Sequence, residues 1–304
     1  MSTAYIFPGQ GSQYVGMGKE LSERFPAARA MFDEADAVLG FPLSSLLFGG
    51  PETELKQTKN TQPAIFLHSV VMWNLLKPAD AAMVAGHSLG EYSALVAAGA
   101  VGFTDALKLV RLRGELMQRA GEEHPGTMAA VVGLAPEAVQ RLCADASVAG
   151  VVQPANFNSP GQIVISGSVD GVRKAMELAK GAGAKLVKEL VVSGAFHSPL
   201  MQSAKERLKE ALDAVPFRDA SIPVYANVTA RPVTTAEEIR TLLFEQVTSP
   251  VRWEESAAAM AAAGASRFVE VGPGKVLQGL VKRTVAAAEC AGFDTAADLP
   301  GASA

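Results

Sequence analysis

The residues with the clearest chemical potential lie in Gly86-His87-Ser88-Leu89-Gly90, which has the G-x-S-x-G pattern. The apolar run before it predicts the end of a buried strand, and the Ala- and Leu-rich run after it predicts a helix. Between a strand and a helix, this pattern is typical of a nucleophile elbow, a sharp turn that exposes a serine. Ser88 is therefore a candidate nucleophile, and the backbone N–H of Leu89 is a candidate donor to an oxyanion. The alternative is a plain tight turn with an exposed serine.

A serine nucleophile needs a base, and the chain has four histidines. His68 falls in a long apolar helix and is typical of a core histidine, while His124 lies in a polar loop. His87 lies inside the elbow and is expected to point away from the serine. His197, in a loop just before a helix, is the best candidate base, because imidazole titrates near neutral pH. The alternative for His197 is a structural role in this loop or at the helix start.

Two arginines on the helix predicted over residues 104–120 fall in different environments. On a helical wheel, Arg113 lies in the middle of an apolar face, whereas Arg111 lies on the polar face and can pair with Glu115. We therefore expect Arg111 to be an ordinary solvated charge. A guanidinium on an apolar face needs an acid or a bound anion, because an unpaired buried charge is costly. Arg113 is thus a candidate anion-binding residue, and the alternatives are a structural ion pair or a side chain that reaches water.

The composition argues against several classes of protein. The 304 residues have a formal net charge of -4, which disfavours a nucleic-acid binder that neutralises phosphates. The two cysteines, Cys143 and Cys290, are far apart, and no cluster of Cys and His predicts a metal site. No apolar run has the length of a membrane span, and no basic segment at the N-terminus indicates a signal peptide. The Gly-rich loop after the first predicted strand fails the dinucleotide fingerprint, because Tyr14 stands at its last glycine position.

Strands and helices alternate on both sides of a middle segment, which predicts an α/β fold with a mostly parallel, hydrolase-like sheet. The middle segment, 124–195, has the order β-α-β-β-α-β of a small ferredoxin-like domain. We therefore expect two domains. Residues 1–123 and 196–304 form the catalytic α/β hydrolase-like domain, and residues 124–195 form the inserted one.

Two connecting segments carry further expectations. A turn is expected over residues 157–161, between two strands of the inserted domain. The tail after Ala286 is small and polar, and we expect it to be disordered.

Eight stretches together resemble the malonyl-CoA:acyl-carrier-protein transacylase family. They follow the order of that family from residue 7 to about residue 283, so the resemblance covers most of the chain. The combination is far more specific than any one motif. The stretches are FPGQGSQ at 7–13, NTQPA at 60–64, GHSLGE at 86–91, RG at 113–114, NFNSPGQ at 156–162, GAFHS at 194–198, QVTSPVRW at 246–253 and EVGPG at 270–274.

This resemblance implies the catalytic roles. Ser88 would be the acyl nucleophile and His197 its base. The backbone N–H groups of Gln10 and Leu89 would form the oxyanion hole. A backbone carbonyl near Gln246, rather than an acid, would complete the set, in agreement with the absence of an obvious Asp in the usual hydrolase order.

The resemblance also implies substrate-binding residues. Arg113 would hold the free carboxylate of malonate, for which its bidentate fork is suited. Gln62, Asn156 and Gln246 match positions that line the site. Phe196 belongs to a Gly-Ala-Phe-His sequence that resembles the malonyl-selective form of the family.

The function implied by the resemblance is malonyl transfer from malonyl-CoA to the phosphopantetheine thiol of acyl carrier protein, through a ping-pong reaction in fatty acid synthesis. The enzyme would need no cofactor or metal, act as a cytoplasmic monomer, and bind neither nucleic acid nor membrane. A basic patch would meet the acidic carrier, with Lys185, Lys188, Lys275, Lys282 and Arg283 as candidates. The alternatives are a free-standing acyltransferase serving a polyketide synthase, a serine hydrolase or thioesterase, and a non-catalytic carrier-docking domain.

Overall fold

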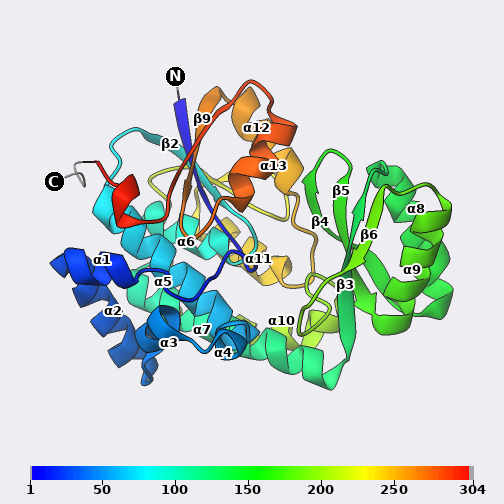
Figure 1. Ribbon diagram of the computed structural model, residues 1–304, viewed down its shortest axis with the longest axis horizontal. Coiled ribbons are helices and arrows are strands. Elements are labelled where there is room, and N and C mark those ends of the chain that lie inside the picture. The colour runs from blue at the N-terminus through cyan, green and yellow to red at the C-terminus, as the bar shows by residue number, and fades with distance from the viewer. Residues whose placement is uncertain (1, 301–304) are drawn as a thin grey trace.

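A six-stranded sheet organises the larger part of the molecule, in a computed structural model that describes residues 2–300 (Figure 1). The strand order is β10-β9-β1-β2-β7-β8, and all neighbours are parallel except β7 and β8. This confirms the predicted mostly parallel sheet. The strands are β1 (Ser2–Phe7), β2 (Ala81–Gly86), β7 (Val224–Tyr225), β8 (Pro232–Val233), β9 (Ala265–Val271) and β10 (Glu289–Phe293).

Helices cover both faces of this sheet, and the alternation of side chains along β1 shows why. Tyr5 and Phe7 belong to the core cluster on the face of α5, α6 and α7, whereas Ala4 and Ile6 belong to the cluster with α12 and α13. A central strand buried on both faces needs apolar residues on both, and residues 4–7 supply them. The helices are α1 (Lys19–Arg24), α2 (Pro26–Leu39), α3 (Leu43–Gly49), α4 (Glu52–Leu55), α5 (Thr58–Leu76), α6 (Gly90–Ala97), α7 (Phe103–Glu123), α10 (Gln202–Ala214), α11 (Ala236–Gln246), α12 (Trp253–Ala262) and α13 (Val276–Thr284), with a short 3-10 helix η2 (Pro199–Met201) before α10.

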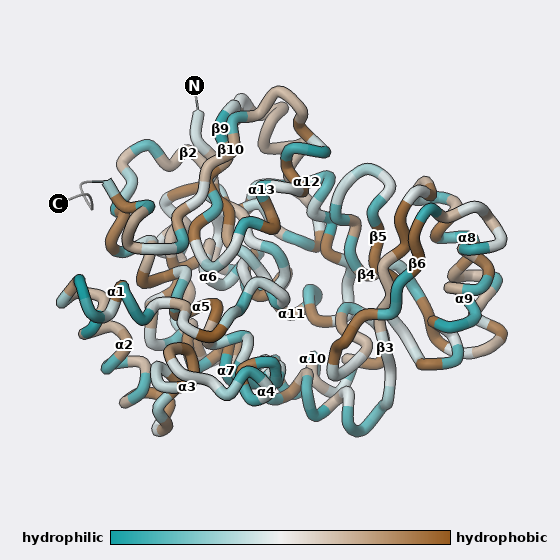
Figure 2. The backbone as a smooth tube through the Cα atoms, viewed as in Figure 1, coloured by the Kyte–Doolittle hydropathy of each residue, from teal (hydrophilic) through white to brown (hydrophobic). Residues whose placement is uncertain are grey.

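A second, four-stranded antiparallel sheet lies beside the larger part, drawn in green in Figure 1. Its order β4-β5-β3-β6 and its β-α-β-β-α-β sequence confirm the ferredoxin-like expectation. Hydrophobic residues recur along its strands in Figure 2 and pack on two helices in a separate core. The domain limits 124 and 195 stay a prediction. The elements are β3 (Gly126–Val132), α8 (Pro136–Ala146), η1 (Ser147–Ala149), β4 (Val152–Ser159), β5 (Gln162–Ser168), α9 (Val169–Gly181) and β6 (Leu186–Glu189).

Two expectations about connecting segments were wrong. The turn expected over 157–161 is confined to Pro160 and Gly161, because β4 continues to Ser159, and Gly161 supplies the positive φ of 69°. The tail expected to be disordered forms strand β10 and the 3-10 helix η3 (Ala296–Asp298). All five residues of β10 pair with β9. Residues 301–304 of that tail lie outside the described residues. Among residues 2–300, no helix combines the length and the apolar character needed to cross a membrane.

The packing of the tail gives the first prediction. Leu299 is 7% exposed and belongs to the main core cluster. We expect Leu299→Ala to lower the free energy of unfolding by about 2 kcal/mol, because it leaves a cavity in that core. Urea unfolding would measure the change. Val191→Ala, at a fully exposed side chain, is the control and should change it by less than about 0.5 kcal/mol. Equal values for the two variants would mean that the tail does not pack in solution.

Candidate active site

The elbow at Ser88 has the strained geometry that the pattern predicts. Strand β2 ends at Gly86, helix α6 begins at Gly90, and Ser88 between them has a φ of 53°, which non-glycine residues rarely adopt. A Cβ on Gly86 would overlap the Gly90 carbonyl, so only glycine allows the strand and helix to approach this closely. The strained backbone is held by Asn227, whose Oδ1 accepts the Ser88 N–H at 2.7 Å and whose Nδ2 donates to the Gly86 carbonyl at 2.6 Å.

His197 lies against the Ser88 hydroxyl in the orientation of a base. Its Nε2 is 2.8 Å from Ser88 Oγ, and its Nδ1 is 2.9 Å from the Gln246 carbonyl and 3.1 Å from the Ser249 carbonyl. Because two carbonyl oxygens can only accept, Nδ1 carries the proton and Nε2 presents a lone pair to the serine. Burial, and next the charge of Arg113, lower the pKa of His197 to about 3. The imidazole is therefore neutral, and able to accept a proton, throughout the neutral pH range.

The guanidinium of Arg113 is buried beside the nucleophile without a carboxylate partner. It donates to Gln62 Oε1 at 2.6 Å, to Gln246 Oε1 at 3.0 Å and to Ser88 Oγ at 3.1 Å. Within residues 2–300 no acid lies within ion-pair distance of it, and its Nε has no hydrogen-bond partner. The side chain is 1% exposed, so it does not reach water. The arrangement leaves a buried positive charge available to an anion that enters the site.

Arg111, on the opposite side of α7, is less simple than the expected solvated charge. It forms the predicted pair with Glu115, with 2.6 Å between Nε and Oε1. Its NH1 also donates to the Lys59 carbonyl and to Asn60 Oδ1, and the guanidinium lies over the Phe41 ring. The expectation was wrong in this respect, because the wheel places a residue on a helix but does not show the neighbouring helix that covers it.

Gln246 connects the base, the arginine and the elbow. Its Nε2 donates to Glu91 Oε2 at 2.8 Å and to the Ser88 carbonyl at 3.0 Å, so its Oε1 faces Arg113. Glu91 is buried, and burial raises its pKa to about 7. It also accepts the Asn227 N–H at 3.0 Å. The sequence reasoning missed Glu91 and Asn227, although a charged residue within the apolar elbow helix was a signal for the first.

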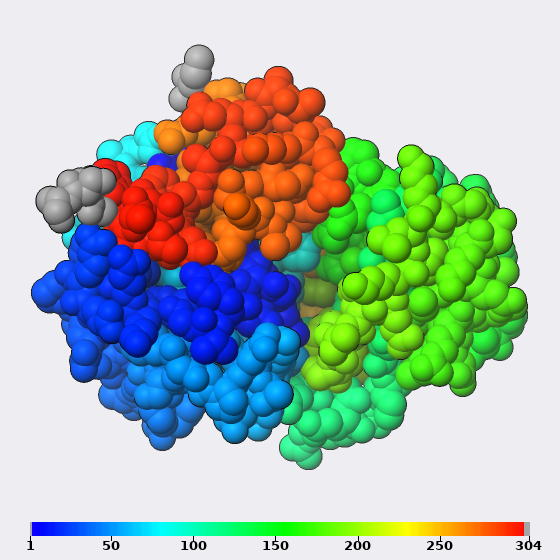
Figure 3. All heavy atoms as spheres, viewed as in Figure 1, coloured from blue at the N-terminus to red at the C-terminus, as the bar shows by residue number. Residues whose placement is uncertain are grey.

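The predicted residues converge on one cleft of about 260 Å³, which Figure 3 shows as a hollow between the larger part and the green small sheet. Eight of the nine predicted residues line it, and Gln246 lies fully buried behind it. Met128 and Val164 of the small sheet and Leu277 and Leu280 of α13 provide apolar walls. The eight are Gln10, Gln62, Ser88, Leu89, Arg113, Asn156, Phe196 and His197.

The remaining predicted residues have contacts consistent with positions around Ser88. The backbone N–H groups of Gln10 and Leu89 have no hydrogen-bond acceptor in the part of the chain that the structure describes. Gly9 packs directly on the His87 carbonyl, which brings the Gln10 loop onto the elbow. His87 points away from the serine, as expected, with its Nε2 2.9 Å from Asn158 Oδ1. The roles of Gln10 and Leu89 as oxyanion donors stay predictions.

The low pKa of His197 leads to a testable pH dependence. Modification of Ser88 by a serine-directed organophosphate requires neutral His197. Because burial and Arg113 lower its pKa from 6.5 to about 3, the neutral form is lost only as the pH falls towards the lower value. We expect the modification rate to show no loss centred near pH 6.5. A tenfold decrease between about pH 7 and 5.5, measured by intact mass, would mean that His197 titrates normally.

Comparison with known proteins places the chain in a family. The family model described as "Acyl transferase domain" matches residues 4–299. The malonyl CoA-acyl carrier protein transacylase of Bacillus subtilis (strain 168) is 52% identical over 283 residues, covering 92% of this chain and 89% of the relative. An acyl carrier protein S-malonyltransferase from Vibrio cholerae has a TM-score of 0.94 at 45% identity, covering 98% of each chain. A malonyl-transacylase solved with its type II PKS acyl-carrier protein has a TM-score of 0.95 at 42% identity, covering 98% of this chain and 97% of that one. This chain therefore belongs to the malonyl CoA-acyl carrier protein transacylase family, as its motifs indicate.

Proposed function

We propose that this protein transfers malonyl groups from malonyl-CoA to the phosphopantetheine thiol of an acyl carrier protein, through an ester on Ser88, for fatty acid synthesis. The observation that carries the proposal is the buried Arg113 guanidinium, which donates to the nucleophile itself and to neutral amide oxygens. A carboxylate-bearing acyl group attached to Ser88 supplies the contacting carboxylate that this cation lacks among residues 2–300. The family relationship supports the same substrate and carrier.

The first half-reaction forms the malonyl ester. Ser88 Oγ attacks the thioester carbonyl while His197 Nε2 takes its proton, across the existing 2.8 Å hydrogen bond. The negative charge on the tetrahedral oxygen is stabilised by the backbone N–H groups of Gln10 and Leu89. His197 then gives the proton to the departing sulfur of coenzyme A, and the ester remains on Ser88.

The second half-reaction is the reverse with a different thiol. His197 takes the proton of the phosphopantetheine thiol as its sulfur attacks the ester carbonyl. The collapse of the tetrahedral intermediate breaks the bond to Ser88 Oγ, which takes the proton back. The two half-reactions consume no cofactor, and we propose that the enzyme needs none.

Arg113 changes partner during this cycle. In the free enzyme its NH2 donates to the Ser88 hydroxyl. An ester oxygen is a weaker acceptor than a hydroxyl oxygen, so acylation frees that donor for the malonyl carboxylate. The planar guanidinium can then hold the carboxylate with two parallel hydrogen bonds, while Gln62 and Gln246 fix its orientation.

Two groups of basic residues flank the cleft and support the expected docking of an acidic carrier. Lys185 and Lys188 are exposed at β6, just before the cleft-lining Leu190. Lys275, Lys282 and Arg283 are exposed at the ends of α13, whose inner face lines the opposite wall. A carrier bridging these groups would present its phosphopantetheine arm to the cleft.

The cellular setting is proposed on chemical grounds. Cys143 and Cys290 are both free thiols, which is compatible with the reducing cytoplasm. We propose a cytoplasmic monomer. A polyketide carrier is a second candidate partner, because the similar transacylase solved with its carrier serves a type II PKS.

Intact mass spectrometry after brief mixing with malonyl-CoA tests the reaction. We expect the wild-type chain to gain one malonyl group, and Ser88→Ala to gain none, because the ester needs the serine oxygen. Added holo acyl carrier protein should remove the group and become malonylated itself. Loss of the group to water within seconds in the absence of any thiol would instead indicate a hydrolase. Parallel assays with fatty acid and polyketide carriers would separate the two candidate partners.

Substitution of Arg113 tests its role in acyl selection. We expect Arg113→Ala to lower the malonyl transfer rate about 100-fold relative to acetyl transfer. Only the malonyl group has a free carboxylate, and in this variant that carboxylate loses its guanidinium partner. Competition assays with both thioesters would measure the ratio. Arg111→Ala, two residues away on the opposite side of the same helix, is the control and should leave the ratio unchanged. Equal losses for both acyl groups in Arg113→Ala would exclude a carboxylate-binding role.

A further inference from the structure

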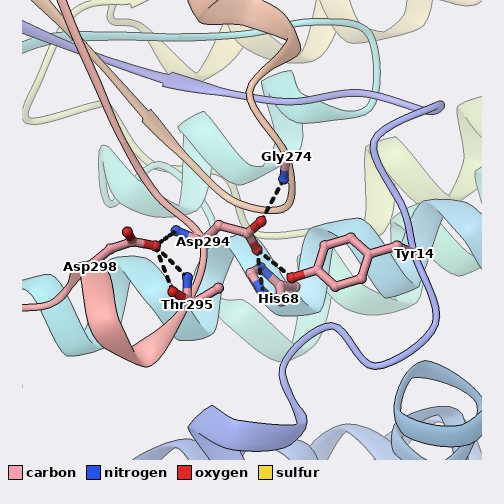
Figure 4. A network of polar contacts seen from close by, with 6 residues as sticks. All are labelled: Tyr14, His68, Gly274, Asp294, Thr295 and Asp298. Carbon is pink, nitrogen blue, oxygen red and sulfur yellow. Dashed lines mark hydrogen bonds and ion pairs between the residues drawn. The ribbon is translucent and has the colours of Figure 1, made fainter.

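The segment that was expected to be disordered carries a carboxylate that joins separate parts of the structure. Asp294, shown with its contacts in Figure 4, follows directly after β10. Its side chain is 22% exposed. Its Oδ1 accepts a hydrogen bond from the Tyr14 hydroxyl at 2.9 Å, and its Oδ2 accepts the Gly274 N–H at 2.9 Å. One carboxylate therefore fixes both the loop after β1 and the turn after β9.

The loop after β1, residues 8–14, contains the proposed oxyanion donor Gln10, and we call it the Gln10 loop. Two side-chain hydrogen bonds tie this loop to the rest of the described chain. Near its start, Gln10 Nε2 donates to Thr58 Oγ1 at 3.3 Å, and at its end the Tyr14 hydroxyl donates to Asp294. The second bond is the shorter one and has a carboxylate acceptor, so it is the stronger constraint.

The surroundings of Asp294 fix it in place. The Asp294 N–H donates to Asp298 Oδ2 at 3.0 Å, and Asp298 also accepts from Thr295. Beneath the carboxylate lies the fully buried His68, with Nε2 3.3 Å from Asp294 Oδ1. Burial lowers the pKa of His68 to about 4, so the ring is neutral at neutral pH.

The turn held by Asp294 also supports the Gln10 loop directly. Gly272, with a φ of 138°, packs on Pro8 at the start of the loop, since a Cβ at Gly272 would lie 2.8 Å from two ring carbons of Pro8. Pro8 is two residues from Gln10. The loop therefore rests on the turn, and the aspartate holds the two together from one side.

We propose that Asp294 is a positioning residue for acyl transfer, which holds the Gln10 loop through Tyr14 so that the Gln10 N–H meets the developing oxyanion. This inference rests on the proposed function. Asp294 does not touch the reacting atoms, and its effect passes through the loop. Because the oxyanion exists only in the transition state, a loosened loop lowers the rate of acylation and leaves ground-state binding of malonyl-CoA unchanged.

Tyr14→Phe tests the proposal, because it removes only the hydroxyl of a side chain that is 38% exposed. The structure offers a matched control in Tyr5→Phe, which removes a 2.7 Å hydrogen bond to Asp80 at the opposite end of the same sheet. Rapid-quench measurement of Ser88 malonylation gives the maximal rate and the half-saturating concentration of malonyl-CoA. We expect Tyr14→Phe to lower the maximal rate about tenfold with an unchanged half-saturating concentration, less than the roughly 100–1,000-fold effect of losing an oxyanion donor. Tyr5→Phe should leave both values unchanged.

A second variant separates positioning from simple loss of stability. In Asp294→Asn one of the two acceptor oxygens becomes an NH2 donor. With the remaining oxygen on the Gly274 N–H, the Tyr14 hydroxyl loses its charged acceptor and can only accept a weaker hydrogen bond from the neutral amide. We expect Asp294→Asn to lower the rate, and Tyr14→Phe to have a smaller effect in that background than in the wild type. Melting temperatures of the Tyr14 and Tyr5 variants should be similar.

Several results would overturn the proposal. The first is a maximal rate for Tyr14→Phe equal to that of Tyr5→Phe, and the second is a change in the half-saturating concentration of malonyl-CoA with no change in the maximal rate. The third is that the effects of Tyr14→Phe and Asp294→Asn on the rate are fully additive. The fourth is that Tyr14→Phe lowers the melting temperature more than Tyr5→Phe does. If wild-type protein forms no malonyl ester, the proposed function fails instead, so the two failures are distinguishable.

Discussion

A positive charge held in the interior, with no carboxylate of residues 2–300 within ion-pair distance, is the constraint on which the site around Ser88 depends. The guanidinium of Arg113 is stabilised by amide oxygens, by the serine hydroxyl and by the face of the Tyr92 ring, whose centroid is 5.7 Å from its central carbon. Dipoles of this kind stabilise a buried cation less well than a carboxylate does. The folded protein thus carries an unfavourable electrostatic term that a substrate carboxylate can relieve. The same charge contributes to the low pKa of His197, so acyl recognition and base strength are set together.

The orientation of one amide makes these two functions compatible. Glu91 accepts the NH2 end of the Gln246 side chain, and this leaves the oxygen end for Arg113. The backbone carbonyl of the same residue accepts a hydrogen bond from the Nδ1–H of His197. If the amide were reversed, an NH2 group would face the guanidinium and repel it. A buried carboxylate that touches neither arginine nor histidine therefore determines the arrangement of both.

The small sheet lines the cleft and also helps to hold His197 in place. Strand β4 forms a bridge with Val251, two residues after the Ser249 carbonyl that contacts His197. On the same strand, Gln153 Nε2 donates to the His197 carbonyl at 2.8 Å. Because His197 has a φ of 58°, its loop needs such support to keep the ring on the serine. A movement between the two parts of the molecule would therefore disturb the base directly.

The elbow, the apolar face around Arg113 and the order of elements could be predicted from the sequence, because each depends on local spacing. Arg113 lies on the apolar face of the helical wheel, and its side chain is buried in the structure. The partners of Arg113 could not be predicted from spacing, because Gln62 and Gln246 come from distant helices and the orientation of their amides depends on third residues. Strand β10 was missed for a related reason. Its small residues lack an alternating apolar pattern, and only pairing with the edge of β9 makes them a strand.

The two carbonyl oxygens behind His197 have a consequence for the choice of nucleophile. A carboxylate in that place would stabilise the imidazolium with a full negative charge, whereas carbonyl dipoles do so less and leave the ring a weak base. A weak base removes a proton more readily from an acidic group, and a thiol with a pKa of about 8.5 is far more acidic than water at about 15.7. The ring thus favours attack on the acyl ester by sulfur over attack by solvent. The carbonyl contacts of Nδ1, on the side of the imidazole that faces away from Ser88, therefore favour transfer over hydrolysis.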